Sequence, residues 1–130
     1  MPIPAARAAA WQPYMLSVLR IMTGLLFMEH GMSKLFGFPP GPHAHFPMLP
    51  WFAGVLECFG GGLVAVGLCT RPVAFLLSGE MAIGYFMFHF PRGFFPLLNG
   101  GDAAVLYCFV FLYLHFAGGG AWSLDRLRNR

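Results

Sequence analysis

Four stretches of the chain are nearly continuous runs of apolar residues, separated by short segments rich in Gly, Pro and Arg. They cover residues 15–35, 51–69, 72–90 and 102–117. The hydrocarbon core of a bilayer needs about 20 mostly apolar residues per helix, with a range of about 17 to 25. The fourth run is the shortest, but it is strongly apolar and glycines bound it on both sides. This pattern predicts an all-α integral membrane protein, folded as one four-helix bundle over residues 1–130.

The composition agrees with burial in lipid. Of the 130 residues, 58% are hydrophobic and only 10% are charged, whereas an average soluble domain has about 25% charged residues. So few charges cannot cover the surface of a soluble domain, which excludes a solvated enzyme domain and a disordered chain. We therefore expect the lipid bilayer as a partner, and no nucleic acid despite the net charge of +3.

The distribution of basic residues predicts the orientation. With four spans, both termini lie on one side, together with most of the arginines. Only Lys34 and Arg92 fall on the other side, so the positive-inside rule places both termini in the cytoplasm of a multi-pass inner-membrane protein. Arg71 and Pro72 follow the second span and lie in a tight hairpin on the inner side. Proline is tolerated in the first turn of a helix, and we expect structural roles for both residues.

Ionisable residues inside the predicted spans are the candidates for chemistry. Each costs about 2.5 to 3.5 kcal/mol at the centre of a lipid-exposed helix, so we expect these side chains to point into the bundle. At a rise of about 1.5 Å per residue, Glu29 and Glu57 lie about 9 Å, and Glu80 about 15 Å, from the outer ends of their helices. The groups that converge on the outer half are Glu29, His30, Glu57, Glu80, His89 and Asp102.

Two interpretations compete for these residues. In the structural one, Asp102 caps the fourth helix, Glu29 or His30 pairs with Lys34 or Arg92, and the other acids hydrogen-bond between helices. In the functional one, the low dielectric favours neutral carboxylic acids that donate to a quinone or substrate oxygen, or that pass protons.

Glycines and aromatic residues surround the same region. Gly61 lies one turn from Glu57, in a Gly60–Gly62 cluster that allows close approach of either a neighbouring helix or a flat ligand. No pattern requires haem, flavin or metal. His43 and His45 lack a third ligand in their proline-rich loop, and the three cysteines form no C-x-x-C pair.

Several motifs together carry a family resemblance. They are GLLFMEHGMSKLFGF at 24–38, ECFGGG at 57–62, GLCTRP at 67–72, GEMA at 79–82, HFPRGFFP at 89–96 and NGGD at 99–102. This combination, spread over residues 19–125, resembles the DoxX family of small bacterial membrane proteins. The resemblance implies a four-helix membrane bundle related to the small subunit of thiosulfate:quinone oxidoreductase. The positions that match the shared motif are Glu57, Arg71, Glu80, His89, Asn99 and Asp102.

The leading functional expectation is a quinone-associated subunit of a membrane redox system. Glu57 and Glu80 would exchange protons with the quinone oxygens, and His89 and Asp102 would relay protons to the outer surface. The residues expected to bind the ligand are Glu29, His30, Arg92, Asn99 and Gly61, with Arg92 balancing charge.

Three questions stay open at this point. Either the chain itself catalyses the reaction, or a soluble or membrane redox partner does so. The chain acts either alone or as a homo-oligomer. The alternative functions are a non-catalytic membrane anchor or assembly partner for soluble enzymes and a small-solute or proton transporter. The transporter is less favoured, because four short helices in one chain would need to oligomerise to form one.

Overall fold

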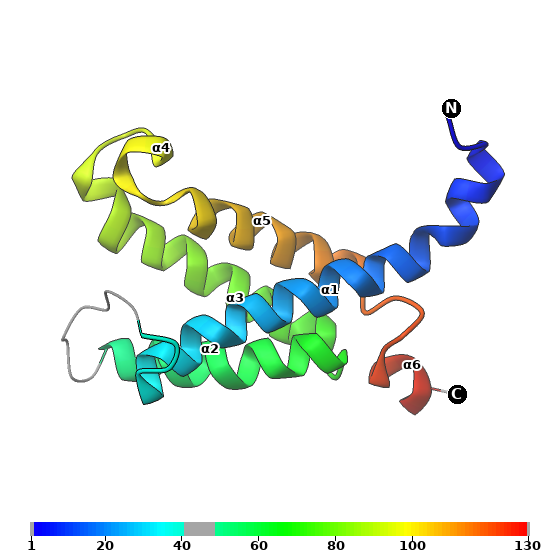
Figure 1. Cartoon of the computed structure of the whole chain (residues 1–130), viewed down its shortest axis with the longest axis horizontal. Coiled ribbons are helices and arrows are strands. Elements are labelled where there is room, and N and C mark those ends of the chain that lie inside the picture. The colour runs from blue at the N-terminus through cyan, green and yellow to red at the C-terminus, as the bar shows by residue number, and fades with distance from the viewer. Residues whose placement is uncertain (1, 41–48, 130) are drawn as a thin grey trace.

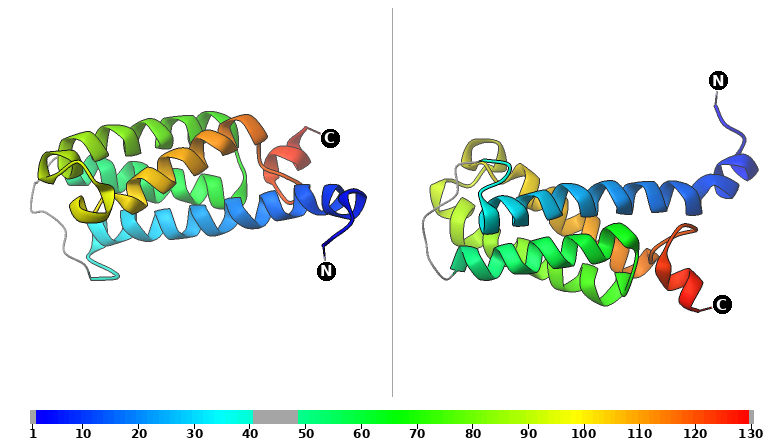
Figure 2. Two further views of the ribbon diagram at one scale, coloured as in Figure 1. Left: turned by 90° about the horizontal axis from the view of Figure 1, so that it is seen from above. Right: turned by 60° about the horizontal axis from the view of Figure 1, so that its bottom comes forward.

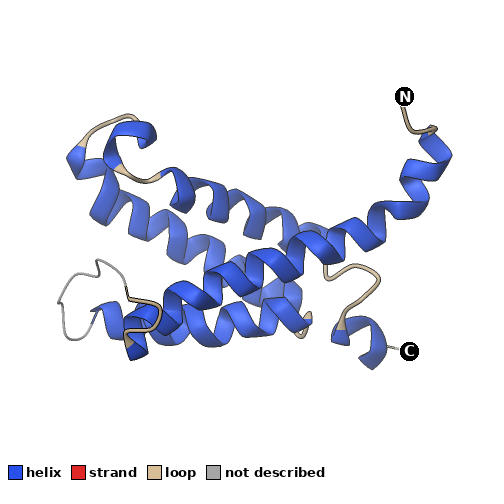
Figure 3. Ribbon diagram, in the orientation of Figure 1, coloured by secondary structure: helices blue, strands red, loops and turns tan. Residues whose placement is uncertain are grey.

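The computed structural model describes residues 2–40 and 49–129 and is built from helices. The long ones are α1 (Ala5–Phe36), α2 (Leu49–Val66), α3 (Thr70–Gly84) and α5 (Asp102–Ala117). The short ones are a π-helical segment η1 (Tyr85–His89), a 3₁₀ turn η2 (Phe90–Arg92), α4 (Pro96–Asn99) and α6 (Leu124–Arg128). The described ranges contain no strand (Figure 3), which confirms the all-α prediction. His43 and His45 lie outside these ranges.

The long helices pack as two antiparallel pairs. α1 lies along α2, α3 lies along α5, and α2 joins the pairs through its contact with α3. Both chain ends lie at one end of the molecule, and α4 lies at the opposite end, in all of the views (Figures 1 and 2). α1 bends near Pro13, as expected for a proline inside a helix.

A small core forms where the long helices meet, and most of the apolar surface faces outward. The Phe27 and Phe111 ring centroids are 4.8 Å apart at its centre. The fully buried apolar residues are Phe27, Val64, Ala74, Leu77, Phe111 and Leu114. Large apolar side chains such as Leu25, Phe75 and Phe109 are exposed on the outer faces. An exposed apolar surface of this extent fits a lipid environment better than an aqueous one.

The helix ends differ slightly from the predicted spans. α2 ends at Val66, because Gly67 adopts a left-handed φ of 74° and its N–H bonds back to the Leu63 carbonyl at 2.9 Å. α3 begins at Thr70, two residues before the predicted third span. Of the described residues, the stretch Thr70–Arg92 is the one long and apolar enough to cross a membrane by length and composition. Trp51–Val66 and Asp102–Ala117 are shorter apolar helices.

Glycines spaced seven residues apart bring α1 and α2 into backbone contact. Gly24 and Gly31 on α1 face Gly54 and Gly61 on α2. A Cβ added to Gly61 would lie 2.6 Å from the Met28 nitrogen, and one added to Gly24 would lie 2.7 Å from the Gly61 oxygen. Small residues at this spacing allow membrane helices to approach closely. These glycines therefore hold the backbones of α1 and α2 close together and fix their register.

We expect the Gly61→Ala variant to be less stable than the wild type by about 1 to 3 kcal/mol, because the added methyl group meets helix backbone that cannot rotate away. Gly62→Ala is the matched control, since its Cβ would meet only the Met28 sulfur, at an ordinary 3.6 Å. Thermal unfolding in detergent measures both variants. Equal melting temperatures for the two would show that the α1–α2 contact is looser than described.

Candidate functional site

A buried ion pair joins α1 to α2 near the α4 end of the molecule. Lys34 Nζ lies 2.5 Å from Glu57 Oε2. The Glu57 side chain is 2% exposed, and that of Lys34 is 23% exposed. Lys34 is placed by the glycine register, because its Cβ lies opposite Gly54, one helical turn before Glu57. The closely packed helices thus hold a charged pair between them.

Glu80 on α3 completes a cluster with this pair, here named the Lys34–Glu57–Glu80 cluster. Glu80 lies close enough to Glu57 and Lys34 to interact with their charges. Its carboxyl oxygen Oε2 is buried and has no hydrogen-bond partner among the described residues. A buried polar atom without a partner is costly. Oε2 is therefore a free hydrogen-bonding position of the cluster.

Two cavities meet at Glu80. One has a volume of about 190 Å³, and its lining includes Lys34, Glu80 and His89. The other has a volume of about 330 Å³. Its lining is apolar apart from Glu80: Leu56, Phe75, Leu76, Gly79 and Ile83. Glu80 and Ile83 line both cavities. A few polar groups beside an apolar wall are typical of sites for hydrophobic ligands.

A hydrogen-bonded loop holds His89 at the rim of the smaller cavity. His89 ends the π-helical segment, and its Nδ1 lies 3.2 Å from the Asn99 carbonyl oxygen. The Asn99 side-chain amide donates to Tyr85 Oη and to the Gly93 oxygen, and its Oδ1 accepts the Gly101 N–H. Asn99 is 1% exposed. The hydrogen bonds within the loop thus occupy the Asn99 side-chain amide. The contact of Asn99 with a ligand, expected from the sequence, stays a prediction. Single π-helical turns occur often at functional sites.

The other predicted site residues lie apart from this cluster. Glu29 and His30 are exposed on α1, and His30 Nδ1 lies 2.9 Å from the Leu26 oxygen. The expectation that Glu29 points into the bundle is wrong, because the α1 face that carries Lys34 turns Glu29 away from α2. The expected pairing of Lys34 with Glu29 or His30 is also wrong, since Glu57 takes Lys34.

Asp102 and Gly61 also differ from expectation, whereas the role expected of Arg92 stays a prediction. Asp102 is exposed in the first turn of α5, and Gly101 holds the capping position that was predicted for the aspartate. Arg92 is exposed, and no described residue pairs with it. Gly61 faces the α1 backbone, so no room is left beside it for the flat ligand considered from the sequence.

At the opposite end of the molecule, a buried arginine fixes the C-terminal segment. Arg20 is 1% exposed, although its charge predicted a position at the cytoplasmic surface. Its guanidinium donates to the Gly119 and Trp122 carbonyl oxygens. Ser17 supports this contact by accepting the Trp122 N–H at 2.9 Å. The arginine is buried because backbone carbonyls of the folded-back segment replace its water.

Arg71 and Pro72 lie at the start of α3, beside the end of α5. Arg71 Nη1 donates to the Phe116 oxygen at 2.5 Å, and the Arg71 carbonyl oxygen lies 2.9 Å from His115 Nδ1. Pro72 sits in the first helical turn, where its missing N–H leaves no backbone partner unsatisfied. Arg71 thus joins the two helices of the α3–α5 pair.

Lys34 is the site residue that the sequence did not single out. Its place near the end of an apolar run made it look like a marker of the membrane surface. The seven-residue spacing of Gly24 with Gly31 and of Gly54 with Gly61 is the signal that could have found it, because this spacing sets which residues of α1 and α2 lie opposite one another. Within the described ranges, no three His, Cys, Asp or Glu side chains are grouped to hold a metal ion.

Comparisons with known proteins extend these findings. The sequence model of the DoxX family matches residues 15–90. An uncharacterised protein of Haemophilus influenzae is 43% identical, covering 88% of this chain and 91% of the relative. The inner membrane protein YqjF of Escherichia coli is 32% identical, covering 87% of this chain and 91% of the relative. An uncharacterised membrane protein of Mycobacterium tuberculosis is 28% identical, covering 97% and 93%.

No solved structure matches this chain. The family match covers all of α2 and α3 and the part of α1 from residue 15 onward, and it includes all members of the Lys34–Glu57–Glu80 cluster. Relatives that are membrane proteins agree with the outward-facing apolar surface. The resemblance seen in the sequence motifs is thereby confirmed: this chain belongs to the DoxX family.

Proposed function

We propose that this chain is a multi-pass inner-membrane protein that binds a quinone at the Lys34–Glu57–Glu80 cluster, as a subunit of a membrane redox system. The observation that carries the proposal is Glu80, which lines both cavities and whose Oε2 is buried without a partner among the described residues. A ligand with a carbonyl or hydroxyl oxygen on an apolar ring fits this environment, because the oxygen pairs with Glu80 and the ring packs on apolar side chains.

The proposed topology is a four-helix bundle with both termini in the cytoplasm. The antiparallel pairs α1–α2 and α3–α5, and the position of both chain ends at one end of the molecule, support an even number of crossings. The end that carries the chain ends also carries Arg7, Arg71, Arg126 and Arg128. The excess of arginine there supports a cytoplasmic side by the positive-inside rule.

Each residue of the cluster has a distinct proposed task. Lys34 balances the charge of Glu57, so that this carboxylate is stable in a buried position. Glu80 then holds a proton or accepts one at the oxygen of the ligand. His89 lies at the cavity rim with Nδ1 held by the loop, which leaves Nε2 to exchange protons between Glu80 and the surface.

The electrons must come from outside the chain. A bound quinone would supply two-electron, two-proton redox chemistry. Cys58, Cys69 and Cys108 are free thiols, and the sequence holds no C-x-x-C pair that could pass electrons. A partner redox subunit is therefore part of the proposal.

Titration of decylubiquinone into the purified protein in phosphatidylcholine nanodiscs tests the site. We expect Glu80→Leu to weaken binding about tenfold, because the ligand oxygen loses its hydrogen-bond partner in a dry site. Glu80→Gln should keep binding within a few-fold, since its amide still offers a donor.

Glu29→Leu is the matched control, because Glu29 is exposed and lines neither cavity. Saturable binding by the wild type, with loss in Glu80→Leu alone, supports the proposal. Absence of saturable binding by the wild type overturns it. Equal binding by Glu80→Leu and wild type also overturns it, and a loss of stability in that variant would then assign the acids to helix packing in a membrane anchor.

A further inference from the structure

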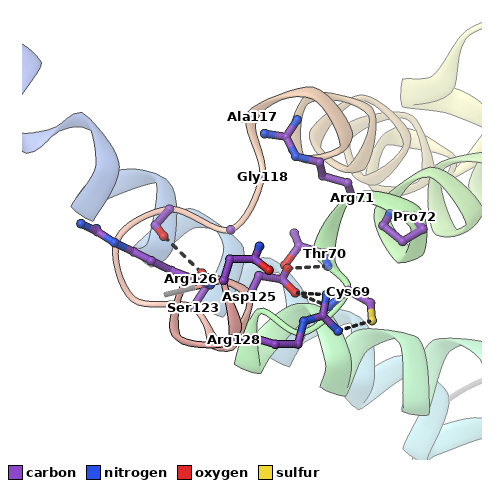
Figure 4. Close-up of a pocket in the computed structure, with 13 residues that line it drawn as sticks. Cys69, Thr70, Arg71, Pro72, Ala117, Gly118, Ser123, Asp125, Arg126 and Arg128 are labelled. Carbon is purple, nitrogen blue, oxygen red and sulfur yellow. Dashed lines mark hydrogen bonds and ion pairs between the residues drawn. The ribbon is translucent and has the colours of Figure 1, made fainter.

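A second cavity system lies at the end of the molecule that carries both chain ends, away from the Lys34–Glu57–Glu80 cluster. A cavity of about 380 Å³ lies between the start of α3, the glycine-rich segment after α5, and α6 (Figure 4). Three arginines line it: Arg71, Arg126 and Arg128. We infer that this cavity binds the phosphodiester headgroup of an anionic phospholipid.

The single acid in the lining is already committed to the protein. Asp125 accepts the Cys69 N–H at 2.7 Å and the Thr70 N–H at 2.8 Å, and its Oδ1 lies 3.7 Å from Arg128 Nη2 (Figure 4). Burial raises the pKa of Asp125, but the N–H groups of Thr70 and Cys69 and the charge of Arg128 outweigh burial and lower that pKa. The aspartate therefore stays ionised, and the three arginines leave the cavity with an excess of positive charge.

The arginines have donors to spare. Arg71 uses Nη1 on the Phe116 and His115 carbonyl oxygens, and these bonds fix its guanidinium at the edge of the cavity. Its Nε and Nη2 have no hydrogen-bond partner among the described residues, and neither has the side chain of Arg126. The planar fork of a guanidinium matches phosphate oxygens well. The cavity thus offers several donors to one anion.

An apolar groove adjoins the charged cavity and argues for a lipid rather than a free anion. The groove, of about 650 Å³, runs between α1 and α5 and shares Ala117 and Gly120 with the charged cavity. Its lining is mostly apolar and includes Met15, Leu16 and Leu19, beside the polar side chains of Gln12 and Tyr113. A site that is positive at one end and mostly apolar along its length is complementary to a phosphate group with an acyl chain attached.

Aromatic side chains place this site at the level of lipid headgroups. The Tyr14 ring packs against Trp122 at 5.2 Å and against Trp11 at 5.8 Å, and all three side chains are exposed. Tyr and Trp concentrate at membrane interfaces, where one end of the ring is apolar and the other is wet. Basic pockets between membrane helices at that level are suited to anionic headgroups.

Native mass spectrometry of the purified chain, with dioleoylphosphatidylglycerol or dioleoylphosphatidylcholine added, tests the inference. We expect preferential binding of the phosphatidylglycerol. Arg126→Gln should weaken this binding about fivefold, and the double variant Arg126→Gln/Arg128→Gln about 10- to 30-fold, at about 1 kcal/mol for each arginine. The matched control is Arg7→Gln/Arg92→Gln, which removes two arginines that do not line the cavity. The single variant Arg126→Gln leaves Arg128 in place, so it still tests the site if the loss of Arg128 disturbs α6.

Further measurements separate a lipid from a free phosphate. Leu19→Trp should fill the groove and weaken phosphatidylglycerol binding, and millimolar inorganic phosphate should not displace the lipid. Equal affinity for both lipids, or equal losses in the arginine variants and the control, would overturn the inference. Displacement by inorganic phosphate, with no effect of Leu19→Trp, would also overturn it and assign the cavity to a soluble anion.

Discussion

Replacing Lys34 with methionine should strongly destabilise this protein. The substitution leaves Glu57 buried, 2% exposed, without its charged partner. Removing one member of a buried ion pair costs about 3 to 5 kcal/mol. Because Lys34 itself is 23% exposed, the lower end of that range, about 3 kcal/mol, is the expected loss in unfolding free energy. Unfolding in mixed micelles, with dodecyl sulfate as denaturant, measures it.

A double variant separates the pair from the packing of its members. Lys34→Met/Glu57→Leu removes both charges together, so its stability should return to within about 1 kcal/mol of the wild type. Arg92→Met is the control for removal of a cation near the same end, and it should change stability by less than about 0.5 kcal/mol because Arg92 is exposed. If the double variant is no more stable than Lys34→Met, the loss belongs to side-chain packing and the paired charges are not its cause.

Replacing Arg20 with methionine should release the C-terminal segment from α1. The arginine donates to the Gly119 and Trp122 oxygens, and hydrogen bonds to a charged group contribute about 1.5 to 3 kcal/mol each. Loss of both, about 3 to 6 kcal/mol together, should raise local opening of residues 118–129 by a factor of about 10² to 10⁴. Methionine keeps much of the apolar stem, so the effect reports the lost donors.

Hydrogen exchange followed by mass spectrometry measures this opening. The informative amides are those of Ala121, which bonds to the Pro13 oxygen, and Asp125, which bonds to the Gly67 oxygen. Arg7→Met, on the same helix but exposed, should leave their exchange unchanged. If the amides of Arg20→Met exchange at wild-type rates, the hydrogen bond from the Trp122 N–H to Ser17 holds the segment without the arginine.

The sequence was informative about depth and environment. Long apolar runs with few charges predicted helices in lipid, because apolar length and composition report directly on the solvent that a helix can tolerate. Local signals were also readable: Ser123 directly precedes the short helix α6 and accepts the Arg126 N–H at 3.2 Å, as expected for a serine at a helix N-cap. The motifs were sufficient to identify the DoxX family.

The sequence was less informative about which way each helix faces. Glu29 and Lys34 are five positions apart and therefore point about 140° apart on α1, at about 3.6 residues per turn. The hydropathy pattern cannot choose between them, because both lie in the same apolar run. Contact with α2 turns Lys34 toward Glu57 and leaves Glu29 exposed. Depth can thus be counted along one helix, whereas orientation depends on its neighbour.

By itself, then, the sequence determined the all-helical fold, the family and the apolar surface, since each of these is written in consecutive residues of one segment. Only the tertiary structure decided that Lys34 pairs with Glu57, that Glu80 keeps an oxygen without a described partner, and that Arg20 is buried. These features join residues 23 to 102 positions apart. Their energies come from desolvation and from helix register, which exist only once separate helices have packed together.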